Sequence, residues 1–119
     1  MKIKSFTEIL QAAGLAAPSF DALIPNDQNY TAMLFQPQGD IEGDPSGVRN
    51  HNRDRAVAQF SRFLQEAVQR QAELAVTPEY SLPWDVLIGA IKSGATPGPG
   101  KLWVLGCESI KYAELSHED

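Results

Sequence analysis

Cysteine and histidine are scarce in this sequence. Cys107 is the one cysteine among 119 residues, so no internal disulfide can form, and the two histidines, His51 and His117, have no cysteine or second histidine at metal-ligand spacing. A disulfide-stabilised secreted domain and a zinc module are therefore both disfavoured. We expect a protein of the reducing cytoplasm that carries no metal and no cofactor.

Basic residues and long apolar runs are also few. Ten Lys and Arg residues against 15 Asp and Glu residues leave a formal charge of −5, and the basic residues are scattered rather than clustered. Nucleic acid and anionic membranes are therefore not expected as partners. The apolar run at 86–91 is far shorter than the roughly 20 residues that cross a bilayer, and the N-terminus lacks the apolar core of a secretion signal.

Apolar residues make up 43% of the chain, which is enough to bury a core. We expect three parts: a helix and irregular lead-in at 1–29, the main body at 30–110, and an acidic tail at 111–119. The lead-in begins with Ser5-Phe-Thr-Glu8, which has the form of a helix capping box.

Strand-like and helical patterns alternate through the main body. Apolar runs predict strands at 30–36, 73–77 and 101–106, and apolar residues at helical spacing predict helices at about 52–71 and 83–92. The segment 39–52, with three glycines and few apolar residues, predicts a long loop. The order β-α-β-α-β predicts an α/β fold with a parallel sheet covered by helices.

In such a sheet the carboxyl ends of the strands share one edge, which is where α/β proteins build their sites. Glu79 is the central candidate, because it follows a strand and precedes a helix that starts at a proline. Its neighbours Pro78, Tyr80 and Leu82 predict partial desolvation, which suits a carboxylate to take and return a proton. The polar residues that the three strand ends bring to this edge are Gln36, Gln38, Thr77, Glu79, Tyr80, Cys107, Glu108 and Ser109.

Each candidate also has a simpler interpretation. A glutamate after a strand is often a solvated loop residue or an ion-pair partner. Cys107 is more typical of a small buried packing residue than of a nucleophile, since no histidine is spaced to serve as its base. Glu108 fits a surface or supporting group or a pocket residue, and Trp84 and Trp103 fit core or helix packing. The pocket candidates are Gln36, Tyr80, Cys107 and Glu108.

The segment Thr77-Pro-Glu-Tyr80, which leads into Leu82-Pro-Trp84, resembles the segment that carries the general-base glutamate in the carbon–nitrogen hydrolases, the nitrilase superfamily. The strand exit Leu105-Gly-Cys-Glu108 is also similar to the family's pattern. The resemblance covers most of this chain, about 30–109, and less than half of a typical family member.

The resemblance implies the N-terminal part of an αββα sandwich and hydrolysis of a non-peptide amide, nitrile or carbamoyl bond. Family members use a cysteine nucleophile, a glutamate base and a lysine that stabilises the oxyanion. Only the glutamate matches a position here, Glu79. Cys107 lies too early to match the nucleophile, and Lys101 and Lys111 match no family position.

We therefore expect the N-terminal portion of a carbon–nitrogen hydrolase-like domain, with Glu79 as general base in the complete protein and a small amide or nitrile as substrate. The alternative is a nitrilase-like binding or regulatory module without catalysis. If the three strands are added in one direction, right-handed crossovers place both helices on one face and leave the other bare. A homo-oligomer, or association with the rest of the domain, is the expected consequence.

Overall fold

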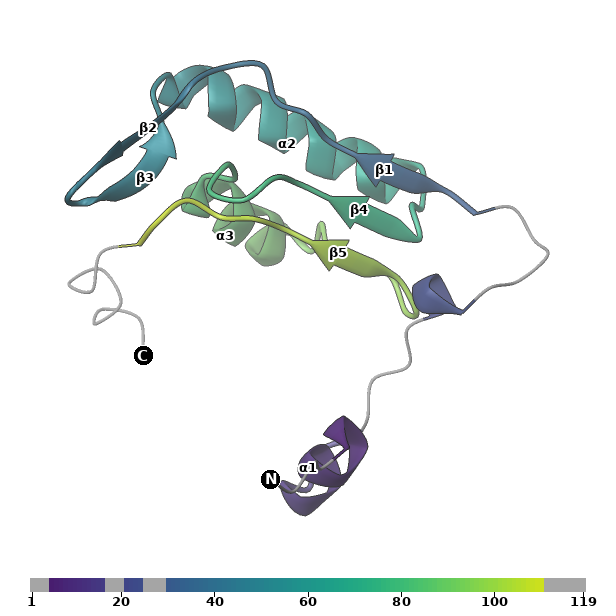
Figure 1. Cartoon of the computed structure of the whole chain (residues 1–119). Helices are drawn as coiled ribbons and strands as arrows, with labels where there is room; N and C mark the ends of the chain where they lie inside the picture. The colour runs from purple at the N-terminus through teal and green to yellow at the C-terminus, as the bar shows by residue number, and fades with distance from the viewer. Residues whose placement is uncertain (1–4, 17–20, 25–29, 111–119) are drawn as a thin grey trace.

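The computed structural model describes residues 5–16, 21–24 and 30–110 (Figure 1). The expected acidic tail at 111–119 lies outside the described residues. The helices are α1 (Phe6–Ala12), the short 3₁₀ helix η1 (Asp21–Leu23), α2 (Arg53–Gln69) and α3 (Trp84–Ser93), and the strands are β1 (Ala32–Leu34), β2 (Ile41–Asp44), β3 (Gly47–Asn50), β4 (Leu74–Val76) and β5 (Leu102–Val104).

Three strands form a parallel sheet in the order β1-β4-β5, which confirms the expected α/β class. The register places Met33 beside Ala75 and Ala75 beside Trp103. Each predicted strand contains one observed strand, and the observed ones are shorter because only their central residues complete the ladder. Nothing in this sheet distinguishes a nitrilase-like sandwich from other α/β arrangements.

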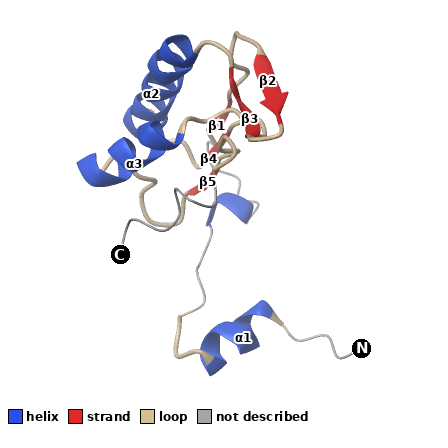
Figure 2. Ribbon diagram, turned by 90° about the vertical axis from the view of Figure 1, so that its left-hand side faces the viewer, coloured by secondary structure: helices blue, strands red, loops and turns tan. Residues whose placement is uncertain are grey.

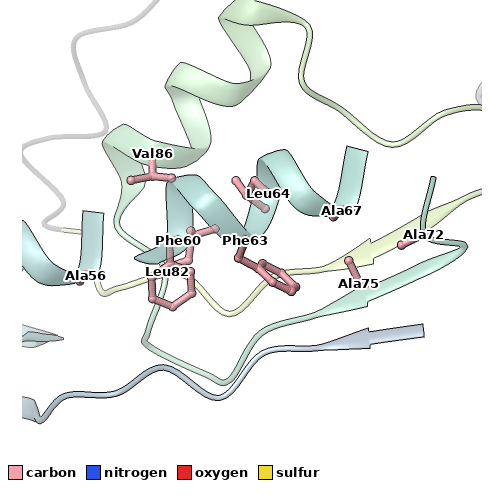
Figure 3. Packing of buried hydrophobic residues seen from close by; sticks show 9 residues of the cluster. All are labelled: Ala56, Phe60, Phe63, Leu64, Ala67, Ala72, Ala75, Leu82 and Val86. Atoms are coloured by element: carbon pink, nitrogen blue, oxygen red, sulfur yellow. The ribbon is translucent and has the colours of Figure 1, made fainter. Parts of the chain in front are cut away.

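Helices α2 and α3 cover the same face of the sheet, as the one-directional strand order predicts (Figures 1 and 2). The side chain of Asn52 caps α2 by accepting a hydrogen bond from the Arg55 N–H at 3.0 Å. Apolar residues of α2 at helical spacing then point to the sheet. The core between the layers consists of Ala56, Phe60, Phe63, Leu64, Ala67, Ala72, Ala75, Leu82 and Val86 (Figure 3).

The predicted loop at 39–52 is wrong, because this segment contains an antiparallel hairpin of β2 and β3. The turn Asp44-Pro45-Ser46-Gly47 has aspartate first, proline second and glycine last, which are the preferences of a type I turn. The Asp44 carboxylate accepts a hydrogen bond from the Ser46 N–H at 2.6 Å. Low apolar content misled the prediction, since this hairpin is held by hydrogen bonds rather than by burial.

The lead-in begins with the predicted capping box. The Ser5 hydroxyl accepts from the Glu8 N–H, and the Glu8 carboxylate accepts from the Ser5 N–H, at 3.2 and 3.3 Å. No α1 residue is buried, and α1 lies apart from the sheet (Figure 1). The 3₁₀ helix is tied to the start of β5, because the Ala22 N–H donates to the Gly100 carbonyl at 3.0 Å.

The face of the sheet opposite α2 and α3 remains uncovered by described elements (Figure 2). Leu34 on β1 is 77% exposed and Val104 on β5 is 50% exposed. The expectation of a bare face is therefore confirmed for the described part of the chain. No helix among the described residues has the length and apolarity needed to cross a membrane.

Candidate functional site

Glu79 lies where the chain leaves the carboxyl end of β4 and before it enters α3. Because the three strands are parallel, the residues after β1 and β5, including Gln36 and Cys107, follow the same ends of the sheet. The position predicted for Glu79 at the carboxyl edge is thus confirmed. What this edge does chemically depends on how the side chains are held.

The turn that carries Glu79 is fixed to the exit of β5. The N–H groups of Ser81 and Leu82 both donate to the Gly106 carbonyl at 2.9 Å. The Gly106 N–H donates to the Thr77 hydroxyl at 3.0 Å, and the Ser81 hydroxyl donates to the Pro78 carbonyl at 2.6 Å. These bonds satisfy the backbone on both sides of Glu79, so its Cα is held by the sheet itself.

Gly106 lies against this turn so closely that no side chain fits there. A Cβ atom at Gly106 would lie 2.1 Å from the Pro78 carbonyl oxygen and 2.6 Å from the Glu79 Cα. Both contacts are with backbone, which cannot move aside as a flexible side chain can. Sequence reasoning included Gly106 only as part of the strand exit and missed its role in supporting Glu79.

The residue after Glu79 has a strained backbone. Tyr80 adopts φ of 56°, in the left-handed region that non-glycine residues rarely occupy. Such a conformation costs on the order of 1–3 kcal/mol and persists where the surroundings enforce it. Strain of this kind is common at functional sites, and here it lies directly beside the candidate carboxylate.

The Glu79 side chain is exposed, so the expected partial desolvation is wrong for this chain. Leu82 does not shield it, because Leu82 is fully buried in the core, and Tyr80 is itself 48% exposed. Within residues 5–16, 21–24 and 30–110, no hydrogen bond or ion pair holds the Glu79 carboxylate. A rigid backbone therefore presents an uncommitted carboxylate to solvent.

Glu108, in contrast, is 7% exposed and supports the structure. Its carboxylate accepts hydrogen bonds from the Asn50 N–H at 2.8 Å and from the Asn50 side-chain amide at 2.7 Å. The Arg53 guanidinium lies 3.7 Å from its other oxygen. The interpretation of Glu108 as a supporting group agrees with this geometry, whereas a surface position does not, because the hairpin covers it.

The hairpin is docked on the exit of β5 by further bonds. Val48 and Ser109 are joined twice, from the Val48 N–H to the Ser109 hydroxyl and from the Ser109 N–H to the Val48 carbonyl, both at 2.9 Å. The Asn50 side chain also donates to the Ser81 carbonyl at 2.6 Å. Asn50 thus connects the hairpin, Glu108 and the turn of Glu79, and the sequence pattern carried no signal for it.

Trp84 and Trp103 have packing roles, as expected. The Trp84 indole N–H donates to the Glu108 carbonyl at 2.7 Å, which ties the start of α3 to the exit of β5. Trp103 packs against the core, and its indole N–H has no partner among the described residues.

Cys107 is half-buried, and its thiol faces the Leu105 carbonyl at 3.9 Å. Burial, followed by the nearby charge of Glu108, raises the pKa of the Cys107 thiol above its ordinary value. The thiol therefore stays protonated at neutral pH, and the protonated form is a poor nucleophile. This supports the interpretation of Cys107 as a packing residue.

Two glutamines follow β1, of which one is exposed and the other is hydrogen-bonded. Gln36 is exposed, while the Gln38 side chain accepts from the Arg55 guanidinium at 2.5 Å. Gln38 and Gln59 also exchange two hydrogen bonds at 2.9 Å. These contacts border a polar cavity of about 180 Å³ between the end of β1 and the start of α2.

Across the described ranges, no cluster of three or more His, Cys, Asp or Glu residues is arranged to hold a metal ion. Comparison of the chain with protein-family models, with curated proteins and with solved structures finds no match. The functional conclusion therefore depends on the residues and geometry alone.

Proposed function

We propose that this chain is the N-terminal part of a carbon–nitrogen hydrolase-like domain in which Glu79 serves as general base. One observation supports this above the others. Glu79 is an exposed carboxylate without a structural partner among the described residues, on a turn held by Gly106 at the carboxyl edge of a parallel sheet. Glu108, in contrast, is paired with Asn50 and Arg53 and has a structural role.

The chemistry follows from acyl transfer. A thiol nucleophile attacks the carbonyl carbon, and the carboxylate takes the thiol proton and passes it to the leaving nitrogen as the carbon–nitrogen bond breaks. Water then hydrolyses the resulting thioester, which releases the acid and regenerates the thiol. Exact placement matters more than mobility, because proton transfer requires approach to about 2.6–3.2 Å. The bonds around the turn hold the backbone from which the Glu79 side chain extends, which supports this role.

Two further groups are required, a nucleophile and an oxyanion donor. Cys107 does not fit the first role, since the raised pKa keeps its thiol protonated. The exposure of Glu79 also leaves its carboxylate hydrated, which weakens it as a base until other residues exclude water. Both observations favour a site to which residues outside these 119 contribute the missing groups. We therefore expect the 119 residues alone to hydrolyse no amide or nitrile.

The decisive experiment is to determine the reading frame beyond codon 119 and to assay the protein it encodes. Strands that end in a lysine and a cysteine, together with amide, nitrile or carbamoyl hydrolysis, are expected. Glu79→Gln should lower kcat/KM by about 10²–10⁴-fold. The matched control is Asp85→Asn, an exposed carboxylate in the first turn of α3, which should leave kcat/KM within about threefold.

The second candidate is a binding or regulatory module that uses the same edge without turnover. The raised pKa of the Cys107 thiol favours it, because Glu79 without a nucleophile cannot complete acyl transfer. A chain that binds small amides without turnover, and loses binding in Glu79→Gln, would support this candidate. If the isolated chain shows turnover, and both Glu79→Gln and Cys107→Ala abolish it, then both proposals are contradicted.

A further inference from the structure

Asn50, the last residue of β3, contacts both Glu108 and the turn that carries Glu79. Its side-chain amide donates to the Ser81 carbonyl at 2.6 Å and to the Glu108 carboxylate at 2.7 Å, so both amide hydrogens are used. The Asn50 N–H donates to the same oxygen of Glu108 at 2.8 Å. Glu108 therefore fixes the orientation of the amide, and the amide in turn holds Ser81.

Ser81 is fully buried and lies two residues after Glu79. Its N–H donates to the Gly106 carbonyl and its hydroxyl donates to the Pro78 carbonyl. Within the described residues, Asn50 is the one donor to the Ser81 carbonyl. A buried carbonyl that loses its donor is costly, because no water replaces the lost hydrogen bond. The turn of Glu79 is thus incomplete without a side chain from the hairpin.

This bond matters because of the strained residue between Glu79 and Ser81. Tyr80 has φ of 56°, a conformation that persists only where the surroundings enforce it. The loss of a hydrogen bond to the buried Ser81 carbonyl and the strain at Tyr80 are of the same order in free energy. Without the Asn50 donor, rotation of the Ser81 carbonyl toward water would relieve both costs at once. The direction of the Glu79 side chain would then change with the turn.

We propose that Asn50 is a positioning residue for Glu79, which keeps the turn in its left-handed conformation through the Ser81 carbonyl. The catalytic consequence rests on the proposed function, in which Glu79 is the general base. Asn50 acts through the backbone, since within the described residues it makes no hydrogen bond to the Glu79 carboxylate. The hairpin of β2 and β3 is therefore part of the site.

NMR spectroscopy of the 119-residue chain tests the conformational role without any need for activity. A left-handed residue brings its own N–H and Hα protons close together, so Tyr80 should give an intense intraresidue NOE. Asn50→Ala should weaken this NOE and speed amide exchange at Ser81 by about tenfold or more. Ser109→Ala is the matched control, because it removes a bond that docks the hairpin at Val48 and leaves the donor to Ser81 in place. It should change neither measurement.

A double variant separates docking of the hairpin from holding of the turn. In Asn50→Asp with Glu108→Gln, the new amide at position 108 donates to the new carboxylate at position 50, so the two positions stay hydrogen-bonded. An ionised carboxylate has no hydrogen to donate to the Ser81 carbonyl. The Tyr80 NOE should therefore weaken in this variant, while slow amide exchange at Val48 shows that the hairpin stays docked.

An unchanged Tyr80 NOE in Asn50→Ala or in the double variant would overturn the proposal, as would an equal change in Ser109→Ala. If Asn50→Ala does not fold, the double variant decides between these outcomes.

In the complete protein, Asn50→Ala should lower kcat by about 10–10²-fold and leave KM within about threefold. An unchanged kcat in Asn50→Ala, where Glu79→Gln does lower kcat, would overturn the positioning role. An unchanged kcat in Glu79→Gln would instead overturn the proposed function, and the Tyr80 NOE would still decide whether Asn50 holds the turn.

Discussion

The two faces of the central sheet are built from the same kinds of residue and have opposite surroundings. Phe60 and Leu64 of α2 fill the space over one face and are buried, while Leu34 and Val104 on the other face remain largely exposed. Residue type therefore does not determine burial in this molecule. The same contrast holds for two glycines, Gly106 and Gly89, and for two glutamates, Glu108 and Glu79: the first of each pair is enclosed and the second is open.

The largest contrast is expected between the two faces themselves. Phe60→Ala should lower the free energy of unfolding by about 3–5 kcal/mol, because the ring is fully buried and its removal leaves a cavity. Leu34→Ala should change it by less than about 0.5 kcal/mol in the monomer. Urea denaturation at low micromolar concentration measures both. Similar losses of unfolding free energy in the two variants would mean that the face of the sheet opposite α2 and α3 is covered in solution.

Glycine provides the second contrast. Gly106→Ala should lower the free energy of unfolding by about 1–3 kcal/mol, since the new Cβ meets the Pro78 and Glu79 backbone. Gly89→Ala is the control in α3, where a Cβ meets nothing within 4 Å. It should stabilise the helix by about 0.5–1 kcal/mol. Denaturation midpoints that move in the same direction would contradict the packing described around Glu79.

The carboxylates of Glu108 and Glu79 provide the third contrast. Glu108→Ala should cost about 1–3 kcal/mol, because the Asn50 N–H and side-chain amide lose a buried acceptor. Glu79→Ala should change the free energy of unfolding by less than about 0.5 kcal/mol. Amide hydrogen exchange should show faster exchange in β3 for the first variant only. A stability loss in Glu79→Ala would reveal a structural role and weaken the case for a general base.

The smallest expected effect concerns the exposed base of the hairpin. The hydrogen bond from His51 to the Glu42 carboxylate, 2.8 Å long, raises the pKa of His51 above its ordinary value of 6.5. The pairing therefore stabilises the hairpin most below pH 6.5, and this contribution is lost as the pH rises through the raised pKa. NMR titration of the His51 ring should show the raised midpoint, and Glu42→Gln should return it toward 6.5.

Sequence patterns were sufficient for most of the fold because local signals and burial agreed. Helical spacing located α2 and α3, the capping box located α1, and apolar runs located all three parallel strands. The hairpin was missed because its stability comes from hydrogen bonds of Asn50 and Val48 with residues about 60 positions away. Pairings across such separations leave no local periodicity.

The sequence by itself determined that Glu79 follows a strand and precedes a helix, and strand order alone then placed it at the carboxyl edge. Only the tertiary structure decided its surroundings: Gly106 packed beneath it, Tyr80 held in a left-handed conformation, and the side chain left exposed. Tertiary structure likewise decided the burial of Glu108, which lies under the hairpin and accepts hydrogen bonds from Asn50. The reason is that connectivity fixes where a strand ends, while desolvation depends on atoms that arrive from distant segments.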